Sequence, residues 1–528
     1  MPSPKGLKML SLNRNPLIYR AIRIHTRPKT LSSSLVVFVV LFVLTFAFIA
    51  LGAIEHISYQ DAETWKINWM DVFQRFSIFC LAVQVFLAFF ITLGVMANSI
   101  SSEKTRNTYE FFETLPIQPA DKVIGLCLGK TLPIMVLTVI LGISGVAFGA
   151  AVNIPMGNLL WLEAIVIIGY AASCLFGLTV SVGAGRSFST MLITIISLFL
   201  SLVLLDTLSE HDFTSIPVWT LSPFCIFAAT ITDLTELPNI IASNNYHFFS
   251  MRVPWQLCPL VFYLFAAVFF FLGSRRALSR PSMLLTSQRL TMLSSLVLHV
   301  LLIGFLADTF RSNINRDDAT SAAMIYLSIF FIMTLGWAML TTPNIANAMQ
   351  WVHRHKIAWP MRIFTHSLKE KETPPFVPMT GLWLLTVLAV LTINALYLHV
   401  LDPLILIVTS LLLLLFMLVY LCAFGAGTLM SRKSGKLIGL LFFLALLLIP
   451  TLFALVTIPR LEGLLVATPF AVIKEFCIYS SQGSNATLDV MVFYKTLGVG
   501  LAELMLFGGI YVCQLRRLQK TPPSRGGL

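Results

Sequence analysis

The chain has 528 residues, of which 57% are hydrophobic and 11% charged, and its formal net charge is +12. A soluble chain carries about a quarter charged residues, so a composition with 11% excludes a soluble enzyme, while the 41 Phe and 9 Trp exclude a disordered chain. Because the apolar runs are long enough to be spanning helices rather than barrel strands, the sequence predicts an all-α polytopic membrane protein.

We predict twelve transmembrane helices, since a spanning helix needs about 20 mostly apolar residues. In chain order the runs lie at approximately 34–54, 73–97, 124–150, 159–182, 189–207, 256–274, 290–309, 321–342, 379–399, 404–428, 437–457 and 493–514. Lys and Arg concentrate before the first run and at alternate ends of the later runs, which predicts that both termini are cytoplasmic. The basic surplus is therefore expected to face anionic lipid headgroups, with no nucleic-acid partner.

Short sequences recur at a nearly constant offset and in equivalent positions. Thr92-Leu93-Gly94 in the second run recurs as Thr334-Leu335-Gly336 in the eighth. The pair Arg275-Arg276 at the end of the sixth run recurs as Arg516-Arg517 at the end of the twelfth. This internal duplication predicts two pseudo-symmetric six-helix halves in parallel orientation.

The two predicted halves are residues 1–289 and 290–528. Each has its longest outer segment between its fifth and sixth runs, at 208–255 and 458–490. Such segments could gate the outer mouth of the bundle or only cap it. Each contains an apolar stretch too short to cross a membrane, expected to be an interfacial or re-entrant helix: Cys225–Thr230 and Ala471–Cys477.

A charged segment follows the second run. We predict a helix with Ser101 or Ser102 as its N-cap and Pro116 at its end. Its charges alternate along one stripe at three- and four-residue steps, beside an aromatic edge of Tyr109 and Phe112. The pattern suits a short helix that lies on another surface, although taken alone it favours a solvated loop helix with internal ion pairs. The stripe consists of Glu103, Arg106, Glu110 and Glu113, and we expect Glu103 and Glu110 to be cytoplasmic and exposed before docking.

The residues of this segment resemble the type-two ABC exporter permease family. The matching pattern is Glu103-Lys104-x-Arg106-x-Thr108-x-Glu110-x-x-x-Thr114-x-Pro116, followed by Gly129-Lys130 at the opening of the next run. In that family the segment is the coupling helix that docks on the nucleotide-binding subunit. The resemblance implies a coupling helix over 101–116, whose partner-binding residues are Glu103, Lys104, Arg106, Thr108, Tyr109, Glu110, Phe112 and Pro116.

The same resemblance has further implications. Asn15-Pro16-Leu17-Ile18-Tyr19-Arg20 looks like the amphipathic elbow helix of that family. Most of its permeases are single six-span units that dimerise, whereas this chain resembles the fused twelve-span permeases associated with antibiotic export. The resemblance implies a multi-pass protein of the bacterial cytoplasmic (inner) membrane, in contact with lipids and with ABC ATPase subunits.

The equivalent segment of the second half departs from the pattern. Residues 344–360 lack the acidic signature and carry basic and aromatic residues instead. We interpret this stretch as a degenerate coupling segment, so that two ATPase copies, or two different ATPase chains, would dock unequally. His353 and His355 point to different faces of a helix, so no metal is expected. The candidate contact residues of this second segment are Trp351, Arg354, Lys356 and Trp359.

The chain is expected to be a non-catalytic permease subunit. The nearest approach to a phosphate-binding loop, Gly125 to Thr131, has three residues between its glycines, where the motif needs four. No nucleophile-base set or paired-carboxylate site is found in the sequence. We therefore expect no cofactor in this chain, with ATP and Mg bound by the partner subunit.

Ionisable groups at membrane depth are functional candidates because they are costly there. Glu503 is predicted to lie near the middle of the last run, facing a substrate cavity or, alternatively, protonated and bonded to a neighbouring helix. His299, Asn394 and Gln84 are expected to make interhelical hydrogen bonds.

The sequence therefore predicts the transmembrane subunit of an ABC transporter that exports a hydrophobic or amphipathic compound, such as a drug, antibiotic, lipid or peptide. The alternative is a secondary transporter with two six-helix halves, driven by an ion gradient through Glu503. A membrane-embedded enzyme would need a large loop with clustered acids or histidines, and neither outer segment offers one.

Overall fold

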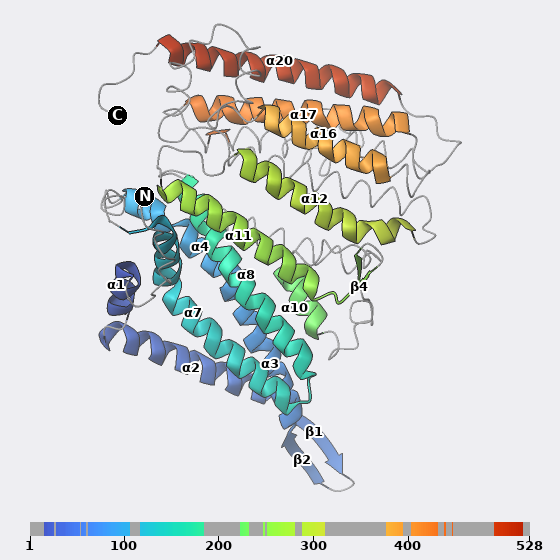
Figure 1. The fold of residues 1–528 in the computed structure, drawn as a ribbon. Helices are drawn as coiled ribbons and strands as arrows, with labels where there is room; N and C mark the ends of the chain where they lie inside the picture. The colour runs from blue at the N-terminus through green and yellow to red at the C-terminus, as the bar shows by residue number, and fades with distance from the viewer. Residues whose placement is uncertain are drawn as a thin grey trace, which may run out of the picture. The chain divides into compact units, whose positions relative to one another are not determined.

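The computed structural model describes residues 15–25, 28–52, 54–59, 62–105, 117–183, 222–231, 246–248, 251–279, 288–311, 376–393, 403–430, 438–439, 446 and 490–520. These residues form helices, together with two two-stranded sheets, β1–β2 and β3–β4 (Figure 1). The contacts divide the chain into two compact units. The first unit contains 1–182, 189–246 and 253–279, and the second contains 183–188, 247–252 and 280–528.

Six described helical runs are long and apolar enough to cross a membrane. They are Trp69–Glu103, Pro119–Ala151, Met156–Val182, Leu257–Ser279, Ile407–Met430 and Tyr494–Leu518. Shorter apolar helices lie at Val39–Leu51, Leu290–Leu301 and Thr380–Ala389, within three further predicted runs. The predicted runs 189–207 and 321–342 lie outside the described residues, and 437–457 is described only at 438–439 and 446. The protein is thus a helical membrane protein, while the number twelve and the two-fold symmetry stay predictions.

The first unit begins with a short helix, a long helix and a hairpin: α1 (Pro16–His25), α2 (Pro28–Gly52), β1 (Ile54–Tyr59) and β2 (Ala62–Ile67). The strands are antiparallel, with Ile54 opposite Ile67 and Tyr59 opposite Ala62. Within this unit the hairpin extends beyond the ends of α2 and the following helix, and α1 lies at the opposite end (Figure 1).

The remaining helices of the first unit follow in one sequence. They are α3 (Trp69–Phe86), the π-helix η2 (Leu87–Ile91), α4 (Thr92–Ala97), α5 (Ser99–Thr105), α7 (Pro119–Ala151), α8 (Met156–Gly183), α10 (Pro223–Ile231) and α11 (Leu257–Ser279). The elements α3, η2, α4 and α5 succeed one another with a turn only at Asn98, so they act as a single long run.

Glycines on α7 allow α3 to approach it closely. The Ser77 hydroxyl donates to the carbonyl oxygen of Gly145 at 2.8 Å. A Cβ at Gly145 would lie 2.7 Å from two carbons of Leu81, and one at Gly149 would lie 3.0 Å from Ser77 Oγ. Small residues at helix contacts are the usual means of close packing in membranes. The interface is extended by a cluster of aromatic rings from α2, α3 and α7 around Phe76.

Helix α8 packs against η2 and α4 through glycines as well. A Cβ at Gly169 would clash with the ring of Phe89. At Gly177 a Cβ would meet backbone atoms, at 2.8 Å from the Leu93 carbonyl oxygen and 3.0 Å from the Ala97 nitrogen. Since backbone atoms cannot turn away as a side chain can, Gly177 fixes how closely α8 and α4 approach.

The apolar stretch predicted at Cys225–Thr230 forms part of the short helix α10. Ser222 begins it, accepting the backbone N–H of Cys225 at 3.4 Å. The ring of Phe224 stacks on Phe90 of η2 with ring centroids 5.2 Å apart. Burial raises the pKa of the Cys225 thiol, and the Ser222 hydroxyl partly offsets the rise. The short helix is confirmed, and its counterpart at Ala471–Cys477 lies outside the described residues.

The described helices of the second unit are α12 (Gln288–Arg311), α16 (Phe376–Ile393), α17 (Pro403–Met430) and α20 (Val490–Lys520). The strands β3 (Tyr246–Phe248) and β4 (Met251–Val253) form the second hairpin. The indole of Trp383 on α16 donates to the Ser410 carbonyl oxygen on α17 at 2.9 Å. Glycines again permit close helix contact, because a Cβ at Gly500 of α20 would lie 2.8 Å from Leu415 of α17.

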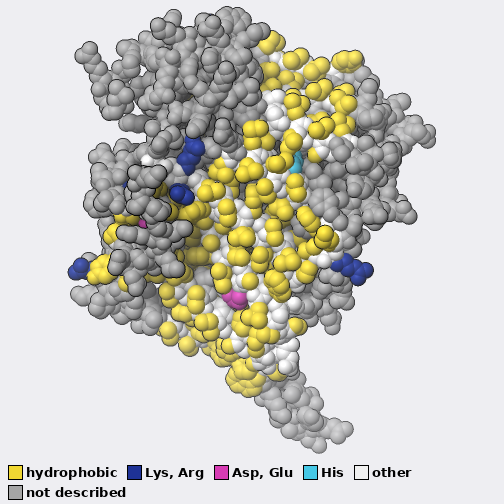
Figure 2. All heavy atoms as spheres, viewed as in Figure 1, with side chains coloured by type: hydrophobic (Ala, Val, Ile, Leu, Met, Phe, Trp, Pro, Cys, Tyr) yellow, Lys and Arg dark blue, Asp and Glu magenta, His cyan; other side chains and the backbone are white. Residues whose placement is uncertain are grey.

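Large apolar side chains cover the outer faces of the described helices. Ile143 and Ile167 are each 66% exposed, on α7 and α8 respectively. Figure 2 shows hydrophobic side chains over much of one described face, with few acidic groups among them. Continuous apolar surface of this kind is characteristic of contact with lipid, which supports the assignment to a membrane.

Candidate functional site at the α1 junction

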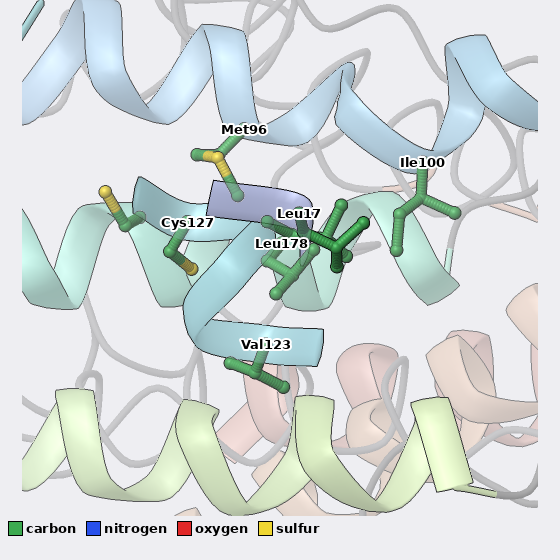
Figure 3. Packing of buried hydrophobic residues seen from close by; sticks show 8 residues of the cluster. Leu17, Met96, Ile100, Val123, Cys127 and Leu178 are labelled. Atoms are coloured by element: carbon green, nitrogen blue, oxygen red, sulfur yellow. The ribbon is translucent and has the colours of Figure 1, made fainter. Parts of the chain in front are cut away.

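Four helical segments of the first unit meet beside α1. We call this meeting point the α1 junction and define it by its buried cluster. Leu17 comes from α1, Met96 from α4 and Ile100 from α5, and the other members come from α7 and α8 (Figure 3). The full cluster is Leu17, Met96, Ile100, Val123, Leu126, Cys127, Cys174 and Leu178.

The sequence Asn15-Pro16-Leu17 explains how α1 docks there. The Asn15 side-chain oxygen accepts the Leu17 N–H at 3.0 Å and so caps α1, while its side-chain nitrogen donates to the Asp121 carbonyl oxygen at 2.7 Å. Pro16 occupies the first helical position, where its missing N–H costs nothing. On α7 a Cβ at Gly125 would lie 2.9 Å from Asn15 and from Leu17, so the glycine makes room for both. One asparagine thus caps α1 and ties it to α7.

Replacing Asn15 by alanine is expected to loosen α1 from α7. The change removes an N-cap, worth about 1 kcal/mol, and a buried hydrogen bond, worth about 1 kcal/mol more. Amide hydrogen exchange of residues 17–25 should therefore speed up markedly. The matched control is Asn68→Ala, which removes the cap that Asn68 provides to the Asp71 N–H on α3 and should leave residues 17–25 unchanged. Equal exchange of α1 in wild type and Asn15→Ala would contradict this account of its docking.

The start of the predicted coupling helix lies at this junction, and its predicted N-cap is wrong. Helix α5 begins at Ser99, and Ser101 lies buried inside it. The first N–H groups of α5 are accepted instead by the Ser181 hydroxyl of α8, at 2.9 Å from Ile100 N and 3.1 Å from Ser101 N. Ser181 lies 80 positions from Ser101 in the chain, so no local sequence pattern indicates this bond. The N-cap was therefore predicted wrongly from the local pattern.

Glu103 is paired rather than exposed. Its carboxylate lies 2.9 Å from the Lys130 ammonium, and its side chain is 16% exposed against 39% for Lys130. The expectation that Glu103 stands free at the surface is therefore wrong, because α7 passes close enough for Lys130 to reach it. Lys130 does not open the next helix either, since α7 already begins at Pro119. Glu103 and Lys130, the first acid and the last lysine of the pattern described above, form one ion pair that joins α5 to α7.

Most other predicted contact residues lie outside the described residues. Lys104 belongs to α5, but its side chain is outside the described part of the structure. Residues outside it altogether are Arg106, Thr108, Tyr109, Glu110, Phe112 and Pro116 of the first segment, and Trp351, Arg354, Lys356 and Trp359 of the second. Among the described residues of the first pattern, Glu103 and Lys130 lie together.

The predicted interhelical hydrogen bonds are confirmed for two of the three side chains named from the sequence. Gln84 of α3 donates through Nε2 to Glu163 Oε2 of α8 at 2.8 Å. His299 Nε2 on α12 lies 3.2 Å from the Thr386 hydroxyl of α16. Asn394 lies outside the described residues. Glu163 was not singled out from the sequence, although a single carboxyl inside the apolar run 159–182 was a signal that could have identified it.

Glu503 lies within α20, as predicted for the middle of the last run. Its Oε2 atom is buried and has no hydrogen-bond partner among the described residues. Lys495, two turns earlier on the same helix, is exposed. The described residues therefore offer no bond to that oxygen from a neighbouring helix.

The described residues contain no group of three or more His, Cys, Asp or Glu side chains that could hold a metal ion. No protein-family model, curated protein or solved structure matches the chain.

Proposed function

We propose that the chain is the membrane subunit of an ABC exporter, a non-catalytic permease that moves a hydrophobic or amphipathic compound using ATP hydrolysed by separate subunits. The observation that carries the proposal is the Glu103–Lys130 ion pair at the end of the Trp69–Glu103 run. It joins two residues of the pattern that resembles the coupling segment, and Glu103 is the last residue of that run.

The connections of α5 give this proposal a mechanical basis. The Ser181 hydroxyl holds its first turn to α8, and Lys130 holds Glu103 to α7. A displacement of residues 101–116 by a docked ATPase would therefore reach α7 and α8 as well as α3. Packed helices with such bonds move as rigid elements, so a push at α5 would reorient the spans around the transport path.

The remaining parts of the proposal extend this unit to the whole chain. Twelve spans in two parallel halves, both termini cytoplasmic, would place 101–116 and 344–360 on the same side of a bacterial inner membrane. Each segment would then face one ATPase subunit, with the second docking more weakly because it lacks the acidic pattern. Lipids would contact the apolar outer faces.

The direct test is to search the genes beside this one for an ABC ATPase subunit and to co-express the two proteins. The purified chain alone is expected to show no ATP hydrolysis, and the co-expressed pair is expected to purify as a complex that hydrolyses ATP. An ATPase subunit with a mutated phosphate-binding lysine is the control for hydrolysis by the partner. Hydrolysis by the chain alone, or failure of the two proteins to associate, would overturn the proposal.

A secondary transporter is the second candidate, and the buried, unbonded oxygen of Glu503 favours it. A carboxyl that takes up and releases a proton is the means by which such transporters couple to a gradient. The two candidates separate in proteoliposomes that contain only this chain: substrate movement driven by a pH gradient, without ATP or a partner, would favour the secondary transporter.

A further inference from the structure

Three helices of the first unit meet at a polar point within the apolar bundle. Gln84 of α3 is 1% exposed, and its Nε2 donates to Glu163 Oε2 of α8 at 2.8 Å. Gly142 of α7 faces both, since a Cβ there would clash with Gln84 Nε2 and lie 2.8 and 2.9 Å from the Glu163 oxygens. The glycine leaves the space that the amide and the carboxyl fill.

The Gln84–Glu163 pair has one hydrogen bond and lacks the hydrogen atom that a second bond would need. Gln84 Oε1 and Glu163 Oε1 are both buried, and neither has a hydrogen-bond partner among the described residues. A buried oxygen without a hydrogen-bond partner is destabilising, and more so when the group is charged. An ionised Glu163 would present only acceptors to Gln84 Oε1, so the second half of the pair would stay open.

Protonation of Glu163 gives both unbonded oxygens a hydrogen-bond partner. The O–H on Oε1 can donate to Gln84 Oε1 while the Gln84 amide continues to donate to Oε2. The carboxylic acid and the amide then form two parallel hydrogen bonds, each group acting once as donor and once as acceptor. No cation is needed for this arrangement, and the side chain of Glu163 carries no net charge in the membrane.

The charged side chains of α3 and α7 lie far from the pair along their helices. On α3 the Asp71–Arg75 ion pair, 2.8 Å long, lies at the start of the helix, and Arg75 is about 13 Å from Gln84 at 1.5 Å per residue. On α7 the nearest charge is Lys130, about 18 Å from Gly142 on the same basis and bonded to Glu103. The ionisable groups on the elements around the pair are Lys29 of α2, Asp71, Arg75 and Cys80 of α3, Asp121, Lys122, Cys127 and Lys130 of α7, Tyr170 and Cys174 of α8, Cys225 of α10, and Cys258, Tyr263, Arg275 and Arg276 of α11.

Glu163 lies at the border between the buried and the outer face of α8. Leu160 and Ile167, one turn to either side, are 59% and 66% exposed, whereas Leu162 and Val166 are each 1% exposed. A small apolar reagent dissolved in the membrane can therefore approach the carboxyl from the outer face. Glu163 therefore has the buried Gln84 amide on one side and the accessible outer face of α8 on the other.

We propose that Glu163 and Gln84 form an intramembrane proton-binding site, in which the protonated carboxyl of Glu163 fastens α8 to α3 across Gly142. The ligand is a proton, and its loss opens one of the two bonds that join the helices. Because α3 continues through η2 and α4 to α5, the site lies on the same run as Glu103. It is independent of whether an ATPase or an ion gradient drives the protein.

The test is labelling of wild-type protein in native membranes with dicyclohexylcarbodiimide, an apolar reagent that modifies protonated carboxyls, followed by peptide mass spectrometry. Glu163 is expected to be labelled about tenfold or more above Asp71 and Glu103, whose carboxylates are ion-paired with Arg75 and Lys130. Labelling of Glu163 no higher than that of these two carboxylates would overturn the proposal. Protection of Glu163 by NaCl but not by choline chloride would also overturn it, because a metal cation would then be the ligand.

Two variants separate proton binding from packing. Glu163→Gln replaces the O–H by an amide N–H and should keep both bonds to Gln84, so its melting temperature in detergent should match that of wild type. Glu163→Leu removes both bonds and should melt several degrees lower. In infrared spectra at neutral pH, a carboxylic-acid carbonyl band should be present in wild type and lost in Glu163→Gln. A carboxylate band lost instead, or a Glu163→Gln variant as unstable as Glu163→Leu, would contradict the protonated pair.

Discussion

Leucine at position 177 is expected to prevent the first unit from reaching its packed state. Even a Cβ at Gly177 would lie 2.8 Å from both the Leu93 carbonyl oxygen and Met96 Cβ, and 3.0 Å from the Ala97 nitrogen. Two of these atoms belong to the backbone of α4, so relief requires the helices to separate. Overpacking of a tight core costs about 3 kcal/mol, and separation here would also disturb the bonds from Ser181 to α5. The measurement is the fraction of monodisperse protein after heating in detergent.

Gly157→Leu is the matched control for this change. A Cβ at Gly157 on the same helix meets nothing within 4 Å, so the same substitution should leave the heated fraction near that of wild type. A Gly177→Leu variant as stable as Gly157→Leu would show that α8 and α4 do not pack as closely as described.

Under the proposed function, reversing the charge of Glu103 and Glu110 together is expected to uncouple the chain from an ATPase subunit while the chain still inserts and folds. Lysine at 103 would face Lys130, whose ammonium now lies 2.9 Å from the carboxylate, so α5 would lose its tie to α7. Under the proposed function, recruitment of the ATPase should weaken about tenfold, equivalent to about 1.4 kcal/mol. Co-purification of the ATPase and ATP hydrolysis by the complex are the measurements.

Two further variants make this result interpretable. The exchange Glu103→Lys with Lys130→Glu restores an ion pair, so it should recover coupling if the pair itself matters. Asp71→Lys reverses a charge in the ion pair with Arg75 at the other end of the same run, and it should not affect the ATPase. Unchanged hydrolysis and recruitment in the Glu103 and Glu110 double variant would return the segment to a solvated loop without a partner.

The helices of this protein could be predicted from the sequence more readily than its contacts. An apolar run of the length of a bilayer forces a helix whatever its neighbours are, so runs such as 73–97 and 404–428 fall on α3–α4 and α17. The partner of Gln84 was not predictable in the same way, because Glu163 lies 79 positions along the chain and no local pattern connects them. The hydrogen bonds from the first N–H groups of α5 to Ser181 could not be predicted for the same reason.

Glu103 shows the same limit in the candidate site. Its place in a charged pattern was visible in the sequence, and so was Lys130, but the sequence suggested that the glutamate was exposed. Whether a charge is free or paired depends on how closely α5 and α7 approach, which the glycines and small residues of the bundle determine. Patterns along one helix therefore identified residues of the site, whereas the pairing between helices required the fold.

The π-helical turn at η2 adds one residue to the Trp69–Glu103 run without adding a turn. A π turn holds one residue more than an α turn, so η2 offsets everything that follows by about 100° relative to a regular helix. This offset is what turns Leu93 and Met96 toward Gly177 while Gln84 still faces Gly142. Chains that share this architecture should therefore conserve the spacing between their equivalents of Gln84 and Met96 more strictly than the residues between them. A deletion of one residue here would rotate α5 rather than merely shorten the helix.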